Sequence, residues 1–149
     1  MEDRVDHLFQ EWHRLGGEVL LKEIDSISVR SPEEVIAESS AHCRESGRLT
    51  WVVLDWLIGH IGEIDEEILL QETKEKGDQS VLGVLCDAAS MRKPHLKLDR
   101  IIASCLPNDR IEPFFYRVAG SSLASRLTKE NPLEVFHKWN FLCSELRYL

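Results

Sequence analysis

Glu134 and His137 have the spacing of a metal-binding pair on a helix, because they end a Glu-x-x-His sequence. Three residues apart, a carboxylate and an imidazole lie on one helix face and could bind one metal ion. A helical di-iron site requires a second such pair and two further glutamates from facing helices. The sequence contains no second Glu-x-x-His. We therefore expect an exposed glutamate and a histidine that covers part of the core.

Asp55 lies beside Trp56 in the most apolar stretch of the chain. Burial at such a position would raise the pKa of its carboxyl group and suit it to acid–base catalysis. Asp55 is aligned at helical spacings, however, with Arg48 and Glu66 in a single polar stripe. We therefore expect a solvated or ion-paired aspartate. His60, four residues after Trp56, is expected to stack on that tryptophan.

Other motifs of catalysis and cofactor binding are missing from the sequence. Ser104, Ser121 and Ser122 occupy positions that suit a nucleophile, but no base or oxyanion site accompanies them. There is neither an HExxH zinc motif nor the glycine spacing of a phosphate-binding loop. We predict no catalytic residue, no cofactor and no metal site. The cysteines lie in apolar surroundings, at least 19 residues apart, as is typical of small buried side chains: Cys43, Cys86, Cys105 and Cys143.

Charge is divided unevenly along the chain. Residues 1–90 contain 8 Lys and Arg against 20 Asp and Glu, whereas residues 91–149 contain 10 against 6, so the two parts carry −12 and +4 of the total −8. Such an asymmetry indicates a contact with a polyanion, or acidic and basic surfaces that meet within the fold or across an oligomer.

A basic cluster at residues 92–100 is the best candidate for a contact with an anionic partner. Recognised DNA-binding and RNA-binding modules need a reading helix or stacking aromatic residues in a basic field. This chain is acidic overall, which repels phosphate at long range. We therefore favour a protein partner over nucleic acid for the four side chains concerned: Arg92, Lys93, Lys97 and Arg100.

The closing segment is rich in large apolar and aromatic residues. We expect it to pack on the core of its own chain. Any part left exposed is predicted to bind a partner or a second copy, since aromatic residues dominate the energetics of interfaces and a large exposed apolar patch seldom lacks a partner. The residues proposed for this role are Trp139, Phe141 and Tyr148.

Helical spacing of apolar residues recurs along almost the whole chain. Ser31, followed by Pro-Glu-Glu, predicts the start of a helix from Pro32 to about Glu45, ended by Gly47. The stretch Leu49–Ile61 is apolar on nearly every side, which predicts a central, enclosed helix. Asp65 is expected to cap the next helix. A first helix, broken or kinked at Gly16-Gly17, is expected over 5–24, and the other helical segments are expected at 65–76, 81–89, 96–105, 111–118, 123–127 and 133–138.

The sequence thus predicts an all-α fold, a compact bundle of about seven or eight short helices around the central helix Leu49–Ile61. A stacked array of helix pairs is the alternative, although no repeat of fixed length is visible. We expect one domain over residues 1–149. The start of the chain has no signal-peptide pattern, and no apolar run is long enough to span a bilayer, so we expect a cytoplasmic protein without membrane contact.

These features favour a non-catalytic module for protein interaction or regulation, whose partner is another protein or a second copy of the same chain. In size and expected helicity the chain is similar to small all-α nucleases of toxin–antitoxin systems, but their signature of arginine, four to six residues and histidine is absent. That activity is therefore not inferred. Two alternatives stay open: a nucleic-acid-associated regulator or antitoxin-like protein using the basic region 92–126, and an enzyme whose site forms only on folding, from Asp55, His60, Glu134 or His137.

Overall fold

The computed structural model describes residues 4–15, 30–115 and 134–142. Within these ranges the chain is mostly helical, which confirms the predicted all-α class. These described ranges contain seven α-helices, two short 3-10 helices and one pair of two-residue strands. In chain order the elements are α1 (Arg4–Leu15), α2 (Pro32–Ser40), η2 (Cys43–Glu45), α3 (Gly47–His60), η3 (Ile61–Glu63), α4 (Glu66–Lys76), α5 (Gln79–Arg92), α6 (Leu96–Ser104), β1 (Glu112–Pro113), α8 (Glu134–Lys138) and β2 (Phe141–Leu142).

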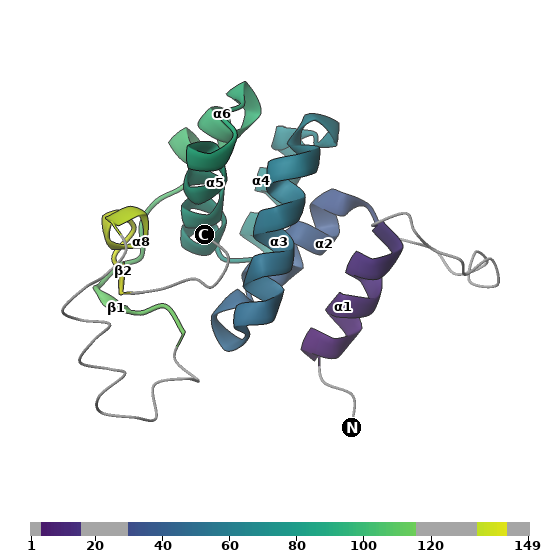
Figure 1. The fold of residues 1–149 in the computed structure, drawn as a ribbon, viewed down its shortest axis with the longest axis horizontal. Helices are drawn as coiled ribbons and strands as arrows, with labels where there is room; N and C mark the ends of the chain where they lie inside the picture. Colours follow the sequence, from purple (N-terminus) through teal and green to yellow (C-terminus); the bar gives the residue numbers. More distant parts are fainter. Residues whose placement is uncertain (1–3, 16–29, 116–133, 143–149) are drawn as a thin grey trace.

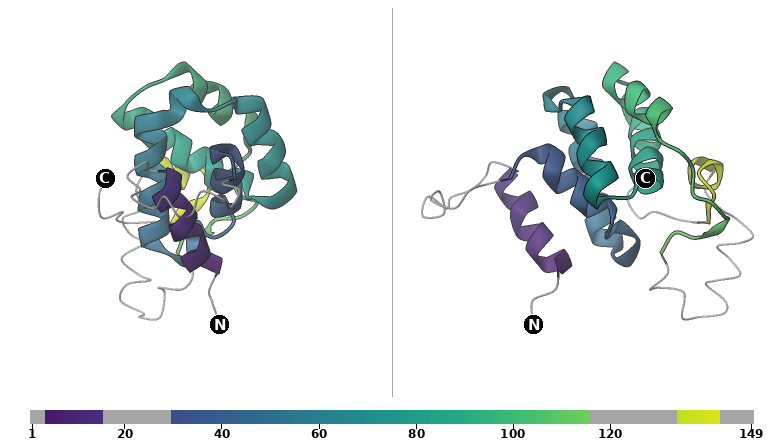
Figure 2. Two further views of the ribbon diagram at one scale, coloured as in Figure 1. Left: turned by 90° about the vertical axis from the view of Figure 1, so that its right-hand side faces the viewer. Right: turned by 180° about the vertical axis from the view of Figure 1, so that it is seen from behind.

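The helices are arranged along the long axis of the molecule in nearly the order of the sequence (Figure 1). Helix α1 lies at one end, α2, α3 and α4 follow, α5 and α6 come next, and α8 lies with the two strands at the other end. The view from behind shows the same order (Figure 2). The most extensive packing joins α2 to α4, α5 to α6 and α3 to α5.

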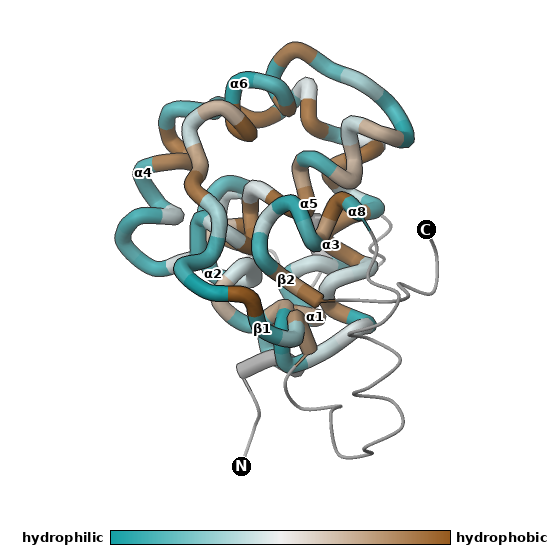
Figure 3. Tube along the Cα trace, turned by 90° about the vertical axis from the view of Figure 1, so that its left-hand side faces the viewer, coloured by the Kyte–Doolittle hydropathy of each residue, from teal (hydrophilic) through white to brown (hydrophobic). Residues whose placement is uncertain are grey.

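Two helices share the centre of the core. Helix α5 is buried at every residue from Ser80 to Ala89, and it contacts α2, α3, α4, α6 and α8. The predicted central helix forms α3, and its buried side includes Leu49, Leu54 and Leu57. Its exposed side carries Arg48 and Asp55 of the predicted polar stripe, whereas Glu66 belongs to α4 and is half-buried. Figure 3 shows hydrophobic and hydrophilic residues alternating along the helices, as expected when each helix turns one face to the core.

Polar side chains begin the helices where the sequence predicts them. The Ser31 hydroxyl accepts a hydrogen bond from the Glu34 amide at the start of α2, and the Asp65 carboxylate accepts two amides at the start of α4. The predicted end of α2 was wrong, because the α-helix stops at Ser40 and residues 43–45 form η2. Gly47 does not end a helix: the Ser46 side chain caps α3, and Gly47 is its first residue.

The prediction of a helix at 111–118 was wrong for residues 111–115, the part of this range that the structure describes. Glu112–Pro113 forms β1, which pairs in parallel with Phe141–Leu142 of β2. Proline has no amide hydrogen and disfavours helical geometry in the residue before it. The Phe114 amide instead donates to the Leu142 carbonyl at 3.0 Å.

Arg44 attaches this strand pair to the helical part of the fold. Its Nε and Nη2 donate to the backbone carbonyls of Phe114 and Pro113 at 2.8 and 2.6 Å. Its Nη1 lies 3.1 Å from a carboxylate oxygen of Glu112, and the guanidinium lies over the Phe141 ring. One arginine thereby satisfies carbonyls that such a short ladder leaves without partners.

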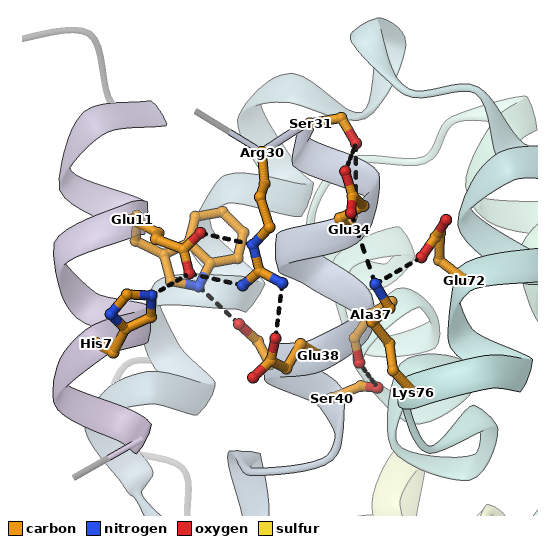
Figure 4. Close-up of polar contacts among 12 residues, drawn as sticks. His7, Glu11, Arg30, Ser31, Glu34, Ala37, Glu38, Ser40, Glu72 and Lys76 are labelled. Carbon is orange, nitrogen blue, oxygen red and sulfur yellow. Dashed lines mark hydrogen bonds and ion pairs between the residues drawn. The ribbon is translucent and has the colours of Figure 1, made fainter. Parts of the chain in front are cut away.

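Arg30 joins α1 to α2 (Figure 4). Its Nε and Nη2 donate to the two carboxylate oxygens of Glu11 at 2.8 and 2.6 Å, and its Nη1 donates to Glu38 at 2.8 Å. Beside this network, the buried Trp12 indole donates to the Ser39 hydroxyl at 2.9 Å. Burial alone would raise the pKa of Glu11, but the hydrogen bonds and charge of Arg30 outweigh it and lower that pKa.

The turn between α4 and α5 lies against α2 at Gly77. A Cβ atom at Gly77 would overlap the Ala37 carbonyl oxygen and come within 2.5 Å of the Ser40 hydroxyl. That hydroxyl donates to the Ala37 carbonyl at 2.6 Å and accepts the Asp78 amide at 2.9 Å. The absence of a side chain at residue 77 is therefore what allows the two backbones to approach.

Gly83 allows Trp139 to pack directly on α5. A Cβ atom at Gly83 would overlap the Trp139 ring and lie 3.0 Å from Cβ of Cys105. We expect Gly83→Ala to lower the free energy of unfolding by about 1–3 kcal/mol, because the ring would have to move within a filled core. Urea denaturation followed by tryptophan fluorescence measures the change.

Gly59→Ala is the matched control, since a Cβ atom there meets no heavy atom within 4 Å. It should leave stability unchanged or raise it by up to about 1 kcal/mol, because alanine favours a helix over glycine. Equal effects of the two substitutions would contradict the packing described for Gly83.

The Glu11–Arg30 pair should contribute to the acid sensitivity of the fold. Because the pKa of folded Glu11 lies below its ordinary value of 4.5, this contribution is fully present above that value and is lost as the pH falls through the folded pKa. Glu11→Gln should flatten the decline in unfolding free energy below about pH 4.5, measured by urea denaturation at several pH values. Glu75→Gln, at an exposed position of α4, is the control; an equal flattening in both variants would argue against the pair.

Candidate functional site

The four side chains considered for catalysis do not converge in the structure. Asp55 is exposed on α3. His60 stacks on Trp56 with 4.9 Å between ring centroids, as predicted, and its Nδ1 lies 2.9 Å from a carboxylate oxygen of Glu63. Glu134 and His137 lie on α8 and line a different part of the surface. Folding therefore brings together only the two residues that were already neighbours in the sequence.

A cavity of about 420 Å³ lies between α5 and α8. The buried Asp87 carboxylate at its edge accepts hydrogen bonds from the Trp139 indole at 2.9 Å and from the Lys138 ammonium at 2.8 Å, both at Oδ2. These donors hold α8 on α5. Within residues 4–15, 30–115 and 134–142, no three His, Cys, Asp or Glu side chains are grouped so that they could bind a metal ion. The lining residues are Asp87, Met91, Glu134, Val135, His137 and Lys138.

Trp139 and Phe141 belong to the core, with 5% and 0% of their surface exposed. Trp139 fills the space beside Gly83, and the Phe141 ring packs edge-on against Phe114. This matches the expectation that the closing segment packs on its own core. It leaves little of either ring for the partner binding predicted at these two residues. Tyr148 lies outside the described residues.

The predicted basic cluster is divided by the fold. The Lys97 ammonium donates to the carbonyls of Gly62 and Ile64 at 2.9 and 2.7 Å, where the chain leaves α3 and η3. Arg100 donates to Glu66 at 3.0 Å. Both side chains therefore have partners within the fold, and Lys97 supplies donors to carbonyls that lack amide partners where helices end. Arg92 and Lys93 lie at the exposed end of α5.

The end of α3, the start of α4, the end of α5 and the start of α6 meet at one end of the bundle, uppermost in Figure 1. Three large apolar side chains are exposed on these elements: Ile68 at 48%, Met91 at 70% and Leu96 at 61%. Exposed acidic residues lie on the α3–α4 side and exposed basic residues on the α5 side. We define the upper-end surface as Glu63, Asp65, Glu67, Ile68, Met91, Arg92, Lys93 and Leu96.

A hollow of about 220 Å³ adjoins this surface. It lies between the end of α3 and the turn that leads into α6, where the His95 ring stands 3.7 Å from the position of a Cβ atom at Gly62. Gly59 also borders it, and space is open above that residue. Of the residues that define the upper-end surface, Lys93 lines this hollow. Its lining residues are Ile58, Gly59, Ile61, Gly62, Lys93 and His95.

The described cysteines are buried, as predicted from their apolar surroundings. Burial raises the pKa of the Cys43 thiol to about 12 and that of Cys105 to about 11, and it also raises the pKa of Cys86 well above its usual value. The thiolate is the nucleophilic form of cysteine, so these positions suit packing and not covalent catalysis. Cys143 lies outside the described residues.

Comparison of the chain with protein-family models, with curated proteins and with solved structures finds no match. In the part of the chain that the structure describes, every helix is too short or too polar to cross a bilayer.

Sequence reasoning missed the exposed apolar side chains of the candidate surface. Met91 and Leu96 lie on either side of the Arg92-Lys93-Pro94 turn, and their position beside a proline-containing break was a usable signal of exposure. Ile68 gave no such signal, because it fits the apolar spacing of an amphipathic helix.

The division of the basic cluster predicts different roles for two lysines. Lys97→Ala should lower the free energy of unfolding by about 1–2 kcal/mol, because two backbone carbonyls lose a charged donor. Lys93→Ala should change stability by less than about 0.5 kcal/mol, as is usual at exposed sites. Thermal and urea denaturation of both variants checks this; an unchanged stability in Lys97→Ala would show that the ammonium does not hold the helix end.

Proposed function

We propose that the protein is a non-catalytic module for protein interaction, and that it contacts its partner through the upper-end surface. The observation that carries this proposal is the exposure of Ile68 near the start of α4, Met91 near the end of α5 and Leu96 at the start of α6. Met91 also lines the cavity between α5 and α8. Exposed apolar side chains with charged neighbours are characteristic of protein contact sites, and methionine and arginine are enriched there.

The placement of titratable groups supports binding in preference to catalysis. Asp55 and His60 do not line the cavity that Glu134 and His137 share. The Asp87 carboxylate in that cavity is occupied by two internal donors. A catalytic site needs a nucleophile or base directed at a reacting atom, and the described residues provide no such arrangement.

A nucleic-acid-associated or antitoxin-like role is the second candidate, favoured by the exposure of Arg92 and Lys93 at the end of α5. Two observations weigh against it. Lys97 and Arg100 already bind groups of the same chain. The acidic residues Glu63, Asp65 and Glu67 border the same surface and would repel phosphate, whereas a protein partner can offer groups of both signs.

Capture experiments with a surface variant test the proposal. The tagged protein, incubated at low salt with lysate of its source cells and with an untagged copy of itself, should retain at least one specific protein. Met91→Ser/Lys93→Glu should retain at least about tenfold less, because it removes an apolar contact and reverses a charge. The retained proteins are quantified by mass spectrometry.

Lys74→Glu makes the same charge change as Lys93→Glu at an exposed position of α4 outside the upper-end surface. It is the matched control and should bind like the original chain. Equal retention by all three proteins would contradict the proposed surface. Retention of generic DNA or RNA that falls steeply with salt, in place of protein, would favour the second candidate.

A further inference from the structure

We propose that the cavity between α5 and α8 is a binding site for an organic cation, an alkylammonium or guanidinium group, and that Lys138 takes the place of this cation when no ligand is bound. The cation belongs to a small amine or to a lysine or arginine side chain of another protein. The inference goes beyond the proposed function and does not rest on it.

The first support is a buried carboxylate whose cationic partner is mostly exposed to solvent. Asp87 has 9% of its surface exposed, and its Oδ2 accepts the Trp139 indole at 2.9 Å and the Lys138 ammonium at 2.8 Å. The Lys138 side chain itself is 65% exposed. An ion pair with one largely hydrated member contributes little to stability, so another cation can replace this ammonium. Lys138 also shows which kind of group the carboxylate accepts.

The second support is the charge of the cavity lining. Both internal donors bind Oδ2 of Asp87, whereas Oδ1 of Asp87 and the Glu134 carboxylate have no partner among the described residues. With His137 neutral, Asp87 and Glu134 provide two negative charges and Lys138 provides one positive charge. Such a lining attracts a cation and repels an anion. A bound ammonium or guanidinium group could donate to both carboxylates.

The size of the cavity and its apolar residues favour an organic cation over a metal ion. Within residues 4–15, 30–115 and 134–142, no group of three His, Cys, Asp or Glu side chains could hold a metal ion. The volume of about 420 Å³ is in the range of small-molecule sites. The Met91 and Val135 side chains also line the cavity. They can contact the carbon chain of an amine, and methionine adapts to irregular shapes.

Helix α8 can release Lys138 without leaving α5. Val135 and Phe136 are 8% and 0% exposed, and the Trp139 indole still donates to Asp87. Exchange of the ammonium therefore requires only a rotamer change of an exposed side chain, which is fast. The rest of the site is formed before the ligand binds.

The Trp139 indole N–H reports on binding, because it donates to the same carboxylate. Its NMR signal, assigned by triple-resonance experiments on the full chain, should shift in a saturable way on titration with butylamine or butylguanidinium at constant pH and ionic strength. Butyrate is the anionic control. It should leave the signal unchanged, since the carboxylates of the lining repel it.

Two substitutions should change the affinity for butylguanidinium in opposite directions. Lys138→Met removes the internal competitor and should strengthen binding at least about threefold. Glu134→Gln removes one carboxylate from the lining and should weaken binding at least about threefold. Lys74→Met and Glu75→Gln make the same changes in net charge at exposed positions of α4. They are the matched controls and should bind like the original chain, and circular dichroism verifies that all four variants fold.

A peptide distinguishes the two sources of the cation. The blocked tripeptide acetyl-Gly-Arg-Gly-amide should bind at least as tightly as butylguanidinium if the site receives a side chain of another protein, whereas weaker binding indicates a small free cation. Either result supports the site. The inference is overturned if neither amine nor guanidinium gives a saturable shift in the original chain and in Lys138→Met, or if butyrate gives the same shift. Unchanged or weaker binding by Lys138→Met would also overturn it, because Lys138 would then be no substitute for a ligand.

Discussion

The complete burial of α5 is the constraint on which the rest of the structure depends. From Ser80 to Ala89 this helix has no side turned to solvent, so neighbours must cover it all round. Trp139 approaches closely only because residue 83 is glycine. The carboxylate of Asp87, in the same helix, must find donors inside the protein, and it finds them in the Trp139 indole and the Lys138 ammonium. One enclosed helix thereby specifies where α8 docks.

Much of the helical architecture could be predicted from local signals. Ser31 and Asp65 begin helices because their oxygens accept free amides, and those amides need a partner in any fold. These local signals gave a wrong prediction where contacts with residues far away in the sequence determine the backbone conformation. Residues 111–118 have a helical apolar spacing, but Pro113 and the carbonyl contacts of Arg44, far away in the sequence, make residues 112–114 an extended segment. The candidate surface was predicted only in part for the same reason: Lys97 and Arg100 look like free cations until α3 and α4 are placed beside them.

Some basic residues of the later part of the chain bind groups of the acidic earlier part within the molecule. Arg100 pairs with Glu66 of the acidic part, and Lys97 is bound by carbonyls of residues 62 and 64. Basic residues of the later chain thus complete the ends of helices formed by the earlier chain. Arg92 and Lys93 are exposed where α5 ends, and Glu63, Asp65 and Glu67 are exposed between the end of α3 and the start of α4. This combination supports recognition of a partner with mixed charge over recognition of a polyanion.

The narrow turn at Gly77 has a consequence for binding. The Ser40 hydroxyl of α2 bonds to the Ala37 carbonyl and to the amide of Asp78, the residue that caps α5, and the Gly77 backbone packs directly on α2, so the turn between α4 and α5 is held against α2. At the other end of these helices, Lys97 and Arg100 tie α6 to the carbonyls of Gly62 and Ile64 and to Glu66 at the start of α4. The helices that carry the upper-end surface are therefore held at both ends before any partner arrives. A partner would meet a prearranged template, so that little conformational entropy is lost on association.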